Sequence, residues 1–103
     1  MGFFGNWKKV KETEFFVGSI EEALYRYRSD YTDLSFSYTR KAVNHLLTIQ
    51  KIDAVGEINA VGWDYIAGLC AKTKVLYERD GHAEQAQSCQ FIIDACNRYL
   101  GRA

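Results

Sequence analysis

The sequence predicts an all-α fold, an antiparallel bundle of about four helices preceded by an N-terminal arm. The 103 residues contain no proline, the residue that breaks helix interiors. Apolar residues recur at helical spacing in several long segments, and short turns at 31–33, 53–56 and 80–81 favour antiparallel neighbours. A small α+β domain with a short hairpin is the alternative, because residues 13–17 and 32–39 also suit strands.

Length and charge narrow the class of protein. A chain of 103 residues, 48% of them hydrophobic, is long enough for one domain with its own core. Its 13 basic and 13 acidic residues give a formal net charge of zero. A nucleic-acid-binding protein normally carries a basic surface that attracts phosphate, so we expect no nucleic-acid partner.

The three cysteines, Cys70, Cys89 and Cys96, lie in apolar surroundings. An odd number without metal-site spacing indicates free thiols in a reducing compartment. The N-terminus lacks the continuous apolar run of an export signal, and no segment approaches the roughly 20 apolar residues of a membrane span. We therefore expect a cytoplasmic protein.

Residues 1–18 form the expected arm, and the pattern leaves open whether it is helix or strand. Phe3, Phe4 and Trp7 lie beside a group of lysines, Lys8, Lys9 and Lys11. Such a segment suits a membrane interface or a protein partner. The interpretation that we rank first is structural, with the aromatic side chains folding back to cover an open end of the core.

The bundle domain is expected over residues 19–103. Ser19 followed by Glu22 has the spacing of a capping box, which predicts a first helix starting at Ser19. A break at 31–33 then separates it from a second helix that ends near Ile52, with Thr32 or Asp33 as its cap. One continuous helix from Ile20 to Ile52 is the alternative.

The segment Ile58–Ala71 is the one around which the bundle is expected to be organised, because it carries a single charge, Asp64. Plotted at 100° per residue, one side is large and apolar, with Ile58, Val61, Tyr65, Ile66, Leu69 and Leu76. A second side consists of the small residues Ala60, Ala67 and Ala71. A helix that is apolar nearly all round is buried on most of its surface, either in the core or between subunits.

The last helix is expected from about His82 to Leu100. Its apolar stripe is the most regular of the chain, spaced 4-3-4-3-4 over His82, Ala86, Cys89, Ile93, Cys96 and Leu100. This spacing is typical of helices that pack along one another at a small angle. Asp80-Gly81 before it and Gly101 after it are stop signals.

No catalytic motif accompanies these helices, and we expect neither an enzyme nor a cofactor. The first hypothesis for function is a small interaction module, an adaptor or regulator that binds another protein or itself as a homo-oligomer. Its predicted partner-binding residues are Ala60, Trp63, Asp64, Ala67 and Ala71, together with Phe3, Phe4 and Trp7 of the arm.

Two other hypotheses remain open. His45 or His82 with a cysteine could form a ligand or metal site inside the bundle, although the spacings that preorganise such sites are missing from the sequence. Peripheral attachment to a membrane surface through the arm ranks below both.

Overall fold

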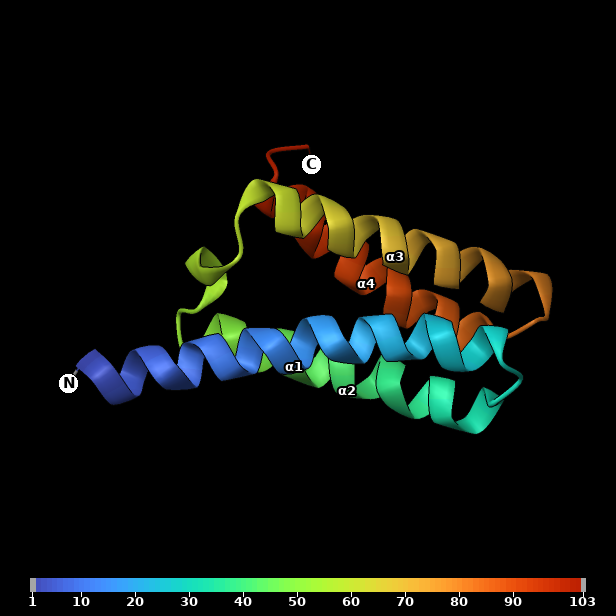
Figure 1. The fold of residues 1–103 in the computed structure, drawn as a ribbon. Helices are drawn as coiled ribbons and strands as arrows, with labels where there is room; N and C mark the ends of the chain where they lie inside the picture. The colour runs from blue at the N-terminus through green and yellow to red at the C-terminus, as the bar shows by residue number, and fades with distance from the viewer. Residues whose placement is uncertain (1, 103) are drawn as a thin grey trace.

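The chain folds into an antiparallel four-helix bundle in a computed structural model that describes the backbone of residues 2–102 and the side chains of residues 6–102 (Figure 1). The helices are α1 (Gly2–Arg28), α2 (Thr32–Lys51), α3 (Ala60–Arg79) and α4 (Ala83–Tyr99), with one 3₁₀ turn, η1 (Val55–Glu57). The predicted all-α class is confirmed. Residues 2–102 contain no strand, so the α+β alternative is wrong.

The four helices form two hairpins stacked on each other. Helix α1 packs antiparallel to α2, and α3 packs antiparallel to α4, while α1 lies along α3 and α2 along α4 (Figure 1). The connection through η1 joins the two hairpins at one end of the bundle. Helix α3 therefore has α1 and α4 as neighbours and keeps one side away from both.

The four helices end in the same way, with a residue in the left-handed region. Its φ is +67° at Asp30, +58° at Asp53, +81° at Gly81 and +71° at Gly101. The next amide donates a hydrogen bond to the carbonyl five residues earlier, in the pairs Tyr31–Arg26, Ala54–Ile49, His82–Tyr77 and Arg102–Asn97. This is the Schellman arrangement, which satisfies carbonyls that the helix leaves free.

The predicted helix start at Ser19 is wrong, because α1 is continuous from Gly2 to Arg28. Ser19 is buried inside the helix and caps nothing. Gly18 costs a helix about 1 kcal/mol relative to alanine, but Phe16 and Ile20 on either side of it are buried in the core. Burying such side chains contributes about 1.5–3 kcal/mol each, which favours an unbroken helix.

The core is layered between the parallel helices α1 and α3. Buried positions recur in the two helices at a separation of 50 residues, in the pairs Thr13/Trp63, Phe16/Ile66, Ile20/Cys70, Ala23/Thr73 and Tyr27/Tyr77. Aromatic rings mark the two ends of this seam. The ring centroids of Phe16 and Trp63 are 6.0 Å apart, and those of Tyr27 and Tyr77 are 5.0 Å apart.

A chain of buried hydroxyl groups fixes the other side of Tyr77. The Ser35 hydroxyl donates to the carbonyl of Ala23 at 2.7 Å, and the Tyr77 hydroxyl lies 2.7 Å from both Ser35 Oγ and Thr39 Oγ1. Because Ser35 has one hydroxyl hydrogen and uses it on Ala23, Tyr77 must donate to Ser35 and accept from Thr39. The resulting series runs in one direction and ties α1, α2 and α3 together.

Candidate interaction surface

The buried side of α3 differs from the predicted one. Trp63, Ile66, Cys70, Thr73 and Tyr77 face the core, with Ala67 at its edge. Val61 and Tyr65, which were expected inside, are exposed. The correction has a physical reason. Tyr77 finds partners for its hydroxyl within the core, and Trp63 packs on Tyr99 with ring centroids 4.6 Å apart. The Tyr77 ring can therefore be buried there at little polar cost, and the Trp63 ring gains an aromatic contact.

The opposite side of α3 is exposed and mostly apolar, and we call it the outer stripe. It consists of Val61, Tyr65, Gly68, Lys72 and Val75, all exposed. The Tyr65 hydroxyl at its edge donates to Glu21 of α1. The exposed fraction is 78% for Val61 and 62% for Val75, although both are residues of a type usually buried. The spacing is 4-3-4-3, the repeat with which one helix packs along another.

The predicted partner-binding residues separate into two groups in the structure. Ala60, Asp64 and Ala71 are exposed beside the outer stripe. Trp63 and Ala67 are buried, with exposed fractions of 2% and 9%. They belong to the chain's own core, so an interface on α3 has to be built from the residues around them.

The aromatic residues predicted for the arm are described only in part. Trp7 is 59% exposed on the first turns of α1, which project beyond the rest of the bundle (Figure 1). It therefore does not fold back over the core. The side chains of Phe3 and Phe4 lie outside the described residues.

Asp64 has a partner that the sequence did not suggest. Its Oδ1 lies 3.1 Å from Nη1 of Arg102, just after the end of α4. Both side chains are more than half exposed, and ion pairs in such positions contribute little, about 0–1 kcal/mol. The carboxylate therefore stays available to a second cation. No ion pair within residues 6–102 involves Lys72, two turns further along the outer stripe.

Gly68 lies in the middle of the outer stripe, and its own chain offers no reason for a glycine. A Cβ added there would meet no atom within 4 Å, so no internal contact requires the missing side chain. Glycine nevertheless destabilises a helix interior by about 1 kcal/mol relative to alanine. A close approach of another backbone from outside would account for it.

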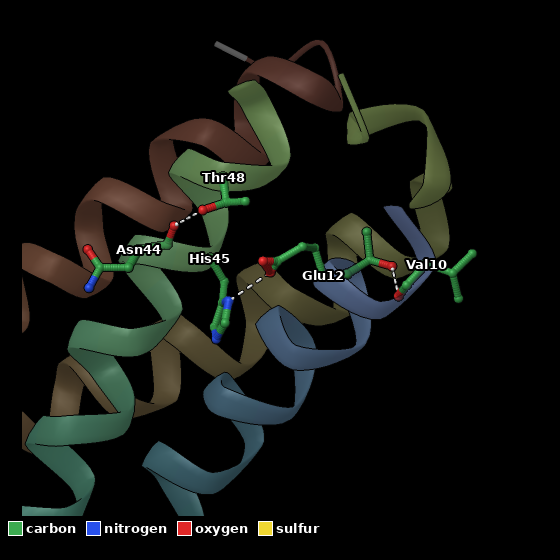
Figure 2. Close-up of polar contacts among 6 residues, drawn as sticks. Val10, Glu12, Asn44, His45 and Thr48 are labelled. Atoms are coloured by element: carbon green, nitrogen blue, oxygen red, sulfur yellow. Dashed lines mark hydrogen bonds and ion pairs between the residues drawn. The ribbon is translucent and has the colours of Figure 1, made fainter. Parts of the chain in front are cut away.

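The two histidines occupy different environments, and neither hydrogen-bonds to a cysteine among the described side chains. His45 on α2 lies with Nδ1 3.1 Å from Glu12 Oε2 on α1, as Figure 2 shows. The ring of Phe15 packs beside it, with centroids 5.7 Å apart. The contact holds α1 and α2 together near the free end of α1.

His82 lies where α4 begins, among three aromatic rings. Its centroid is 4.9 Å from that of Phe36, 6.1 Å from Tyr27 and 6.4 Å from Tyr77. Next to this cluster the Tyr27 hydroxyl donates to Asp80, which also pairs with Arg79 at 2.9 Å. Burial and this bond raise the pKa of Tyr27 to about 12, while Arg79 and Tyr27 lower the pKa of Asp80 to about 2.

The cysteines are buried, and burial raises their pKa values. The pKa of Cys89 rises to about 12 and that of Cys96 to about 11, and the pKa of Cys70 is raised well above its usual range. A thiol must lose its proton to act as a nucleophile or to bind metal. Within residues 6–102, no group of three or more His, Cys, Asp or Glu side chains is placed to hold a metal ion.

Comparison with known proteins adds no relative, since no family model, curated protein or solved structure matches the chain. None of the described helices is long and apolar enough to cross a membrane.

The outer stripe was not predicted from the sequence, although a pattern that indicates it is present. Val61, Gly68 and Val75 are spaced by seven residues, and the residues between Ala60 and Ala71 include one charge.

Proposed function

We propose that this protein is a non-enzymatic interaction module that binds a helix of another protein chain along the outer stripe of α3. The observation that supports the proposal most directly is the exposure of Val61 and Val75 on a helix surface that carries two exposed charges between residues 60 and 75, Asp64 and Lys72. Contiguous exposed apolar surface on a small domain commonly marks a binding site.

The shape of the surface favours a helix as the ligand. The outer stripe is a ridge and not a pocket, and its 4-3-4-3 spacing supplies anchors on one face over four turns. Ala60, Gly68 and Ala71 leave the backbone of α3 accessible at three points. Small residues of this kind allow a second helix to pack closely.

The proposal can be tested by placing a photo-crosslinking amino acid at position 75 in the cells from which the protein comes. We expect a discrete adduct from position 75 and none from a control at Leu47, which is 47% exposed on α2. The captured chain is then identified by mass spectrometry and its affinity measured with purified components.

Val61→Glu should weaken that affinity about tenfold or more, because it places a charge in an apolar contact. Leu47→Glu, a change of the same kind on another helix, should leave the affinity unchanged. Equal labelling from the two positions, or equal effects of the two glutamates, would refute the assignment of the outer stripe.

A further inference from the structure

We infer that the helix bound by the outer stripe is α3 of a second copy of this chain, packed antiparallel with Gly68 on the twofold axis. This inference rests on the proposed function and names its partner. Exposed residues of α3 that lie equally far before and after Gly68 match each other: they are either both apolar or of opposite charge.

An antiparallel pair centred on Gly68 places each residue opposite the one equally far on the other side of position 68. Val61 then faces Val75 of the second copy, and Asp64 faces Lys72 of the second copy. Each of these contacts occurs twice in the dimer, because a twofold interface is built from the same patch on both subunits. Apolar residues meet apolar residues, and opposite charges meet.

The charges select the antiparallel direction. If two α3 helices packed parallel in register, Lys72 would face Lys72 and Asp64 would face Asp64, and like charges opposite each other are unfavourable. Lys72 forms no ion pair within residues 6–102, and the Asp64 pair with Arg102 is open to solvent. Lys72 can therefore form the contact between subunits, and Asp64 can accept it beside or in place of its exposed pair with Arg102.

Gly68 gives a second, independent reason for packing two α3 helices against each other at this point. At the point where two helices cross, the backbones come closest, and a residue without a side chain lets them approach. Gly68 lies at the centre of the palindrome formed by Val61, Asp64, Lys72 and Val75, and its own chain leaves that space empty. The zero net charge of the chain also means that two copies do not repel each other over distance.

The first test is a charge swap, measured by light scattering and sedimentation over a wide range of protein concentration. Lys72→Asp and Asp64→Lys should each raise the dimer dissociation constant about tenfold or more. The double variant Asp64→Lys/Lys72→Asp should restore it to within about threefold of the original value, because it exchanges the signs and keeps every pair opposite.

The second test fixes the geometry. Gly68→Cys should oxidise to a disulfide-linked dimer, because the two positions face each other across the axis, whereas Val61→Cys should not link to itself. A mixture of Val61→Cys and Val75→Cys chains should give the mixed dimer. The native cysteines are buried and should stay reduced in all of them.

A chain that stays monomeric up to millimolar concentration overturns the inference, as does a dimer unaffected by both single charge variants. Efficient self-linking of Val61→Cys would also overturn it, because it indicates parallel packing. Failure of the proposed function looks different. A monomer that still crosslinks a different protein from position 75 leaves the interaction module standing and removes only the second copy as its partner.

Discussion

Tyr77→Phe removes one hydroxyl from the centre of the buried series that joins Thr39, Tyr77, Ser35 and Ala23. The ring itself, which is fully buried, stays in place. Ser35 keeps its bond to the Ala23 carbonyl, but Thr39 loses the acceptor of its hydroxyl hydrogen while only 3% exposed. A buried hydroxyl without its partner costs about 1–3 kcal/mol.

We therefore expect Tyr77→Phe to lower the free energy of unfolding by about 1–3 kcal/mol. For a domain of this size, each kcal/mol shifts the melting temperature by about 4–8 °C. Urea unfolding followed by circular dichroism at 222 nm measures the change, with Tyr25→Phe as the matched control. Tyr25 is 60% exposed, so its substitution should change stability by less than about 0.5 kcal/mol.

A double-mutant cycle makes the test specific to the hydroxyl series. Thr39→Val keeps the volume of the side chain and removes the other member of the pair. The double variant Tyr77→Phe/Thr39→Val should cost less than the sum of the two single variants, because neither partner is then left unsatisfied. Strict additivity, or equal effects of Tyr77→Phe and Tyr25→Phe, would refute the reasoning.

Three further predictions concern other parts of the fold. Gly81→Ala should destabilise the protein by about 1–2 kcal/mol, because φ at this position is +81°. Asp53→Gly, at φ +58°, should stabilise it by less than about 1 kcal/mol. Thermal unfolding should therefore show a lower melting temperature for the first variant and a higher one for the second. A thiol reagent such as DTNB should leave Cys70, Cys89 and Cys96 unmodified at neutral pH and titrate all three in denaturant, and rapid labelling of the folded chain would contradict their burial. The pKa of Asp80 is lowered to about 2, so the stabilising contribution of its ionised form should be fully present above about pH 4 and lost as the pH falls to 2. The pKa of Tyr27 is raised to about 12, so the stabilising contribution of its protonated hydroxyl should be lost between about pH 10 and 12. The difference in urea midpoint between the wild type and Asp80→Asn should therefore be smaller at pH 2.5 than at pH 7.

The helix hairpins were predictable from the sequence because their signals are local. Proline is absent, Asp80-Gly81 is a turn dipeptide, and the 4-3 spacing of the last helix is regular. The start of α1 was not predictable in the same way. Ser19 and Glu22 match a capping box, but burial of Phe16 and Ile20 in a distant core decides against a helix end there.

Which side of α3 is buried was also not predictable from the sequence alone. A hydropathy pattern places Val61 inside and gives Tyr77 and Thr73 an intermediate rank, because polar groups are assumed to prefer water. Tyr77 is buried because Ser35 and Thr39, about 40 residues away in the sequence, offer partners for its hydroxyl. A hydrogen bond between such distant segments cannot be predicted from the pattern of one helix. With Tyr77 and Trp63 on the buried side of α3, Val61 and Val75 lie on the exposed side and form the candidate interaction surface.

The stacking of two hairpins has a consequence for how the chain reaches this structure. Helices α1 and α2 are joined by a three-residue turn, as are α3 and α4, so each pair can close at a small entropic cost. The parallel contacts of α1 with α3 and α2 with α4 require the longer connection through η1 and form between segments about 50 residues apart. Folding should therefore proceed by formation of the two hairpins, followed by one docking step. The layered seam between α1 and α3 should be the last part of the core to exclude water.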